Sequence, residues 1–339
     1  MKFRLLSLYL VVILSVFGII FSFSLNKIRA ASSSSVLVNI APENPAPHED
    51  VTIDLSSYAN NLDSVSILWS LNGRNVLSGI GKKSFSLTAP AAGEEAIITA
   101  NISFPDGNLE KRIIIRPSVM VLLSQATDSF VPPFYRGKAM PTADSEIKIV
   151  AMPEISALGS PESLRRSLVD PKNMTYAWKK DYTNNQEASG YGKNFFIYTN
   201  DYLEDSNTVS VVASTVDQKY SSEANIEVGV AEPKIVFYKN DNALGTIWER
   251  ALSDSYRMEN ADMIVEAAPY FISPKELLHP YLIWTWSIND TAVPVPDFKK
   301  NFMPLRIQSG TSGTAKLRLV IENMDKIFQT MSKEVNIEF

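Results

Sequence analysis

The residue types that most often carry catalysis or bind metals are scarce in this chain. Its 339 residues include no cysteine and two histidines, His48 and His279. A zinc site would therefore have to recruit carboxylates, and the chain contains no His-Glu-x-x-His run and no Gly-x-Ser-x-Gly nucleophile elbow. A lone histidine lacks the ligand count that a metal site requires, so we expect both histidines to lie in a turn or at the end of a helix. The sequence predicts a protein without catalytic residues, and thus no enzyme.

Calcium is the one cofactor for which the sequence offers ligands. Asn240-Asp241-Asn242 and Asp205-Ser206-Asn207 place several side-chain oxygens in expected loops. The same residue types also form ordinary turns through their own backbone. We favour the turn interpretation and keep calcium as the alternative.

Net charge excludes one class of partner. Without residues 1–30 the chain keeps 28 basic and 37 acidic residues, a net charge of −9. Nucleic-acid-binding proteins carry clustered lysine and arginine that neutralise phosphates. We therefore expect no nucleic-acid partner.

The N-terminus has the composition of an export signal. Residues 5–25 are 21 consecutive uncharged, mostly apolar positions with basic residues on both sides. About 20 apolar residues are enough to span a bilayer, whereas a cleaved signal usually has a shorter apolar region. Ala30 and Ala31 nevertheless offer small residues for cleavage, and a Ser-rich spacer occupies 31–36. Residues 1–30 are thus a signal peptide or a membrane anchor, and the chain is either membrane-anchored with extracytoplasmic domains or secreted.

A tryptophan that returns at a near-constant interval predicts an internal repeat. Trp69, Trp178 and Trp286 are 109 and 108 residues apart, and each closes a run in which apolar and polar residues alternate. Such alternation is typical of a strand with one buried face. A phenylalanine follows each of them after 16, 18 and 16 residues, at Phe85, Phe196 and Phe302. We expect these six aromatic side chains to form the cores of three equivalent units.

Turn signals recur about every ten residues between the short strand patterns, as in an antiparallel β-sandwich. Arg116-Pro117 and Ala231-Glu232-Pro233 read as junctions, which predicts domains over 37–116, 117–231 and 232–339. The second and third units also contain Ser-Pro steps before the tryptophan strand, at 160–168 and 273–278, where we expect short helices.

Strand-embedded tryptophans in tandem units of about 100 residues resemble the bacterial immunoglobulin-like (Ig-like) and PKD-like repeat domains of exported surface proteins. The resemblance covers nearly all of the chain after Ser35. It implies an all-β fold of three tandem Ig-like sandwiches. Trp69-Ser70-Leu71-Asn72-Gly73 stands where PKD repeats have Trp-aromatic-Gly-Asp-Gly, so a generic Ig-like assignment is preferred.

This architecture favours a non-enzymatic stalk, adhesion or assembly module at the cell envelope or surface, with a protein or glycan partner. The alternatives are an accessory docking component of a pilus or secretion apparatus, and a carbohydrate-binding protein. Exposed aromatic residues in loops are the candidate contacts: Phe134, Tyr135 and Tyr191.

Overall fold

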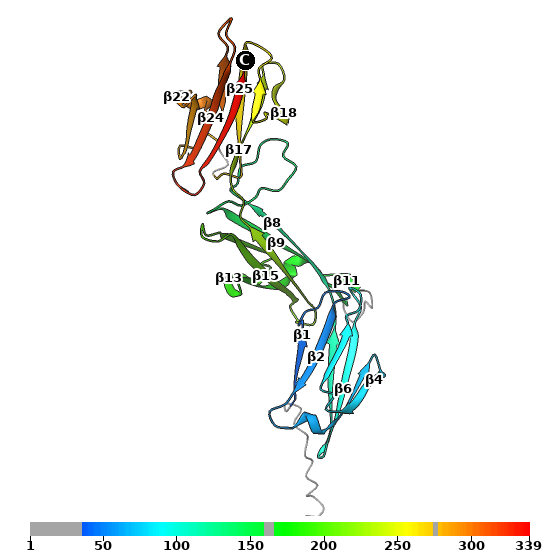
Figure 1. Cartoon of the computed structure of the whole chain (residues 1–339). Coiled ribbons are helices and arrows are strands. Elements are labelled where there is room, and N and C mark those ends of the chain that lie inside the picture. The colour runs from blue at the N-terminus through cyan, green and yellow to red at the C-terminus, as the bar shows by residue number, and fades with distance from the viewer. Residues whose placement is uncertain (1–35, 159–165, 274–276) are drawn as a thin grey trace, which may run out of the picture. The chain divides into compact units, whose positions relative to one another are not determined.

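The computed structural model describes residues 36–158, 166–273 and 277–339, and these residues fold into three tandem Ig-like antiparallel β-sandwiches (Figure 1). The export signal and the Ser-rich spacer lie outside the described residues. Within the described residues, no helix has the length and apolar character needed to cross a bilayer. The chain divides into two compact units that meet between Ile115 and Arg116, and the second unit contains the second and third sandwiches.

The first sandwich has seven strands in two sheets. One sheet has the order β1-β2-β5 and the other β4-β3-β6-β7. Burial alternates along β2 and β6, so each strand gives one face to the core, as the sequence pattern predicts. The strands are β1 (Leu37–Ala41), β2 (Asp50–Ser56), β3 (Ser66–Leu71), β4 (Arg74–Ile80), β5 (Ser84–Thr88), β6 (Ala96–Phe104) and β7 (Gly107–Ile115).

The second sandwich repeats this strand order. Its sheets are β14-β9-β8 and β13-β12-β15-β16, and a short hairpin of β10 and β11 is added. The strands are β8 (Val119–Ala126), β9 (Glu146–Glu154), β10 (Ser156–Leu158), β11 (Arg166–Leu168), β12 (Met174–Lys180), β13 (Thr183–Tyr191), β14 (Phe195–Thr199), β15 (Ser206–Thr215) and β16 (Ser221–Gly229).

The third sandwich keeps the two-sheet plan and changes its edges. Its sheets are β18-β17-β20-β23 and β19-β25-β24-β21-β22, and β19 pairs with β25 in parallel. The strands are β17 (Lys234–Asp241), β18 (Gly245–Ala251), β19 (Ser255–Arg257), β20 (Asp262–Tyr270), β21 (Leu282–Ile288), β22 (Thr291–Val293), β23 (Phe302–Arg306), β24 (Thr314–Asn323) and β25 (Met331–Glu338).

The three repeat tryptophans occupy equivalent buried positions on β3, β12 and β21. Trp69, Trp178 and Trp286 are at most 1% exposed. Each indole Nε1–H donates to the backbone carbonyl of a lysine. This lysine lies just before an edge strand of the opposite sheet, which is β5, β14 or β23. The three acceptors and distances are Lys82 at 2.7 Å, Lys193 at 2.9 Å and Lys300 at 2.8 Å. The recurring lysine after each tryptophan strand therefore marks a backbone acceptor that the fold holds in place.

The turn after each tryptophan strand is also repeated. Asn72, Asp181 and Asn289 all adopt positive φ, and the residue after each does too, as the tightest two-residue hairpins require. The side-chain Oδ1 of each accepts a backbone N–H from the neighbouring strand, at 2.8–2.9 Å. Burial raises the pKa of Asp181, but hydrogen bonds from Lys180, Thr208 and Asn207 outweigh it and leave that pKa below its ordinary value.

Two of the three phenylalanines expected in the cores contact the repeat tryptophans. Phe85 stacks on Trp69 with ring centroids 5.4 Å apart, and Phe196 lies 5.7 Å from Trp178. The prediction is wrong for Phe302, because β23 is offset by one residue relative to the tryptophan. Met303 faces the core instead, and Phe237 from β17 stacks on Trp286 at 5.4 Å.

The two predicted helices fall partly on residues 159–165 and 274–276, which lie outside the described residues. Where the structure describes these insertions, the prediction is wrong. Arg166–Leu168 form strand β11, because Ser156–Leu158 supply the backbone partners that a helix would have found within itself. Leu277 and Leu278 lie in a turn.

Replacing Trp69 with alanine should destabilise the unit that ends at Ile115 by about 3–5 kcal/mol, because it leaves a cavity and removes the hydrogen-bond donor of the Lys82 carbonyl. Urea unfolding followed by hydrogen exchange of each unit will measure this loss. Tyr58→Ala, at a side chain that is 97% exposed, is the matched control and should change stability by less than about 0.5 kcal/mol. Equal effects of both variants would contradict the repeat alignment.

Domain junction and candidate binding surfaces

The second and third sandwiches share a junction built by the long loop between β8 and β9. Phe130 in this loop exchanges backbone hydrogen bonds with the third sandwich: its N–H donates to the Ile272 carbonyl at 2.8 Å, and its carbonyl accepts from Phe271 at 2.7 Å. The Phe130 side chain packs against the core of the third sandwich. In Figure 1 this loop reaches the base of β17. The loop thus joins the second sandwich to the third through paired backbone and a packed side chain.

A buried amide network crosses the same junction. Gln329 is fully buried, and its Oε1 accepts from Ser273 N–H and Asn323 Nδ2, both at 3.0 Å. Its Nε2 donates to the carbonyl of Ala143, in the loop between β8 and β9, at 2.7 Å. Both polar atoms of the Gln329 side chain therefore have hydrogen-bond partners, and these bonds link the second sandwich to the third. Buried amides arranged in this way restrict geometry because few other arrangements satisfy them.

A charged pair closes the rim of the junction. Lys326 Nζ lies 2.9 Å from Asp128 Oδ2 and donates to the Asp144 carbonyl at 2.7 Å. The two side chains are about one quarter exposed. Ser273 Oγ also donates to Asp128 Oδ2, at 2.9 Å. The ammonium group is thus shared between a carboxylate and a carbonyl that both belong to the second sandwich.

Aromatic rings complete the junction and include one predicted contact residue. Tyr135 packs edge-on against Tyr270 and Phe271, at centroid distances of 5.7 and 5.9 Å. Burial and the hydrogen bond with Tyr238 raise the pKa of Tyr270 above its ordinary value. Tyr202 stacks flat on Phe328 at 4.4 Å. Tyr135 therefore lies within the molecule's own interface.

The other two predicted contact residues lie on separate surfaces. Phe134 is 86% exposed and has a positive φ, so its ring projects from the loop. Tyr191 is 60% exposed at the end of β13, and its hydroxyl donates to Asn173 Oδ1 at 3.1 Å. Within the part of the chain that the structure describes, no contact joins Tyr191 to Phe134 or Tyr135. The three residues do not form one site.

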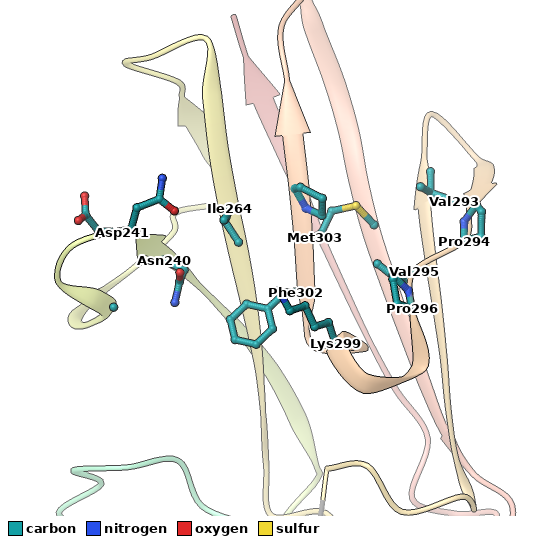
Figure 2. Close-up of a pocket in the computed structure, with 13 residues that line it drawn as sticks. Asn240, Asp241, Ile264, Val293, Pro294, Val295, Pro296, Lys299, Phe302 and Met303 are labelled. Atoms are coloured by element: carbon teal, nitrogen blue, oxygen red, sulfur yellow. The ribbon is translucent and has the colours of Figure 1, made fainter.

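A groove of about 600 Å³ runs along the outer edge of the third sandwich (Figure 2). Asn240 and Asp241 lie on one side of it, Phe302 lies in the middle, and the Val293–Pro296 segment lies on the other side. Hydrogen bonds from the backbone N–H groups of Ala243 and Leu244 hold the pKa of Asp241 below its ordinary value. Asp241 thus performs the turn-forming role that its sequence context predicts.

The other residues considered for metal binding are also engaged in local contacts. Asn207 Nδ2 donates to Asp181 Oδ2 and to Glu204, and Ser206 Oγ donates to Glu227 at 2.9 Å. His279 Nδ1 accepts from the Tyr281 backbone. Over residues 36–158, 166–273 and 277–339, no group of three His, Asp or Glu side chains is placed to hold a metal ion.

The second sandwich exposes an apolar sheet face. Its three-stranded sheet turns one cross-strand row outward, Leu123, Val150 and Phe195, and neighbouring positions add Val121, Met152 and Ile197. Leu123 is 56% exposed and Phe195 46%. The charged side chain among them, Lys148, lies over the Phe195 ring at 4.7 Å. This exposed apolar face is a candidate interaction surface, because covering apolar side chains removes them from water.

The equivalent face of the first sandwich is polar. Aligning Phe196 with Phe85 places Asn39, Asp54 and Ser84 at the positions of Leu123, Val150 and Phe195. The sandwich fold therefore does not require this apolar face. The sequence pattern does not reveal this face, because period-two alternation identifies a strand but does not say which face is buried where both faces are apolar.

No protein-family model and no curated protein matches the chain. Solved structures give distant likenesses. The fibronectin(III)-like modules of CbhA from Clostridium thermocellum are 15% identical over 57% of this chain and 94% of theirs, with a TM-score of 0.26. The central fibronectin-III array of RIM-binding protein is 10% identical over 89% and 95%, with a TM-score of 0.30. Three domains of the bacteriophage RB49 outer capsid protein Hoc are 8% identical over 90% and 97%, with a TM-score of 0.23. Scores this low carry no argument about function.

Replacing Gln329 with alanine should weaken the junction, because the buried Ser273 N–H and the Ala143 carbonyl each lose their hydrogen-bond partner. We expect a loss of about 2–4 kcal/mol in the stability of residues 116–339. The chain has no native cysteine, so spin labels at Val216→Cys and Leu244→Cys, both exposed, report the distance between the two domains. That distance distribution should broaden in Gln329→Ala.

Gln308→Ala is the matched control, since Gln308 is an exposed glutamine of the third sandwich. It should leave both the stability and the distance distribution unchanged. An unchanged distribution in Gln329→Ala would show that the amide network does not set the domain geometry.

Proposed function

We propose that the chain is an exported, non-enzymatic repeat protein that acts as a stalk at the cell envelope or surface. The observation that carries the proposal is the junction of the second and third sandwiches. Two cores joined by paired backbone, a buried amide network and a charged pair transmit orientation in a way that a flexible linker cannot. A stalk needs that property to hold a binding surface away from its attachment point.

The N-terminal composition supports the location. Residues 5–25 predict export, and the rest of the chain contains no second apolar run of that length. The alternating strands can build stable cores without disulfides, in agreement with the absence of cysteine. We propose that the three sandwiches lie outside the cytoplasm and are either tethered through residues 5–25 or released by cleavage near Ala30.

Fractionation of cells that produce the full chain, with intact-mass measurement of the product and protease treatment of whole cells or spheroplasts, tests this location. A tethered stalk should appear at full length in the membrane fraction with its sandwiches accessible to protease. A secreted form should begin near Ala31. A full-length product that stays in the cytosolic fraction and is protected from protease would overturn the proposal.

The apolar face of the second sandwich favours docking into an envelope assembly, such as a pilus or a secretion apparatus, as a second candidate function. The double variant Leu123→Glu, Phe195→Glu places charge on this face without touching the core. We expect it to shift the native mass of the protein in detergent extracts of the envelope from a larger complex to the single chain.

Asn39→Glu together with Ser84→Glu makes the same change at equivalent positions of the first sandwich and should leave the native mass unaltered. The docking candidate fails if the wild-type chain already migrates alone.

A further inference from the structure

The third sandwich lacks part of a strand that the other two possess. In the first sandwich β4 pairs with β3 from Ser66 to Leu71, and in the second β13 pairs with β12 from Thr175 to Lys180. In the third, β22 pairs with β21 only from Trp286 to Ile288. Among the described residues, no strand pairs with the outer edge of β21 from Leu282 to Thr285.

Two prolines explain why β22 stops early. Pro294 and Pro296 hold their own φ near −65°, far from the φ of about −140° in an antiparallel strand, so the segment after Val293 does not continue along β21. The segment instead turns across the sandwich, and Val293 and Val295 pack against the core (Figure 2). The first two sandwiches have a different sequence here, Ser78-Gly79-Ile80-Gly81-Lys82 and Ser189-Gly190-Tyr191-Gly192-Lys193. The shortening of β22 thus follows from the sequence of the third unit.

The open edge presents backbone groups. The Tyr281 carbonyl accepts from Met324, and the Asn289 N–H donates to Lys316, so these odd-numbered residues point toward β24. Strand alternation directs the N–H and C=O of Trp284 to the opposite, unpaired edge. An extended peptide can therefore form a regular antiparallel ladder there.

A groove lies beside this edge. It has a volume of about 360 Å³ and is bounded by residues 282–286 of β21 and by the Ala292–Val295 segment, with Asp297 and Lys300 at its rim. Trp284 lines it, and its indole Nε1 is shielded from solvent and has no hydrogen-bond partner among the described residues. The three repeat tryptophans, by contrast, all satisfy this N–H within their own domain. The groove gives an extended segment room to lie beside the unpaired backbone groups of Trp284.

We propose that the outer edge of β21 is a strand-addition site for an extended peptide segment of a partner protein. The first two sandwiches indicate the chemistry of the occupant. By alignment of the repeat tryptophans, Trp284 corresponds to Ile67 and Tyr176, and the residue opposite each of these is a glycine, Gly79 or Gly190. The peptide therefore carries a small residue opposite Trp284. The next residue of the peptide is larger and apolar, like Ile80 after Gly79 and Tyr191 after Gly190. The paired length is roughly 13 Å, so binding is short and depends on register.

Register-specific disulfide trapping on the full chain in mild detergent tests the site. Ile283→Cys introduces the only cysteine, at an exposed position of β21. The probe is a synthetic peptide with the sequence of residues 74–83 and cysteine in place of Ile80, the residue that pairs with Ser66 at the equivalent position of β3. We expect a yield of mixed disulfide about tenfold above that from a peptide with cysteine in place of Gly79, whose side chain points to the other face.

Ser66→Cys is the matched control chain, because Ser66 is exposed at the equivalent strand position and is already paired with Ile80. It should give only background trapping. Equal yields from both peptides, or from both chains, would overturn the strand-addition site. Disulfide-linked dimers of Ile283→Cys formed without peptide would also overturn it, since a second copy of the chain would then be the occupant. None of these outcomes depends on where the protein resides.

Discussion

One hydrogen bond inside each sandwich links its two sheets. The repeat tryptophan lies on a central strand of one sheet, and its indole N–H donates to a lysine carbonyl just before the edge strand of the other sheet. Tryptophan can be buried completely only if its N–H finds a partner, so the carbonyl and the ring constrain each other. Because the acceptor is a backbone atom, the bond fixes the path of the chain between the sheets. The lysine side chain takes no part in this bond.

The turn that follows the tryptophan adds a second constraint. Asn72, Asp181 and Asn289 each bond through their side-chain oxygen to the next central strand, so that strand is aligned with the tryptophan strand. Ring, turn and acceptor together set the register of the sandwich. This explains why the tryptophan interval and an Asn or Asp at the first position of the turn recur while most other positions differ.

Sequence patterns predicted the parts of the molecule that repeat, because three copies of a constraint are visible as three copies of a residue. The fold class and the positions of Trp69, Trp178 and Trp286 follow from that repetition. Phe302 shows the limit of this reasoning, since a one-residue offset in β23 leaves the spacing intact and turns the ring to the other face. The junction could not be foreseen at all. Asp128 and Lys326 are 198 residues apart, and neither belongs to a repeated pattern.

The departures of the third sandwich from the repeat occur together at its edges. β18 widens one sheet, β19 adds a parallel strand to the other, and Pro294 and Pro296 cut β22 short. Exposed sheet edges tend to pair indiscriminately, and proteins protect them by shortening, twisting or covering them. Relative to the first two sandwiches, β18 and β19 each add a strand at a sheet edge, and the strand that pairs with the outer edge of β21 is shorter. Among the described residues, the stretch of β21 without a partner strand is four residues long, and the proline-containing segment lies beside it. Short edges of this kind limit unspecific pairing. An edge shaped in this way is better explained by selective pairing with one segment than by a general weakness of the sheet.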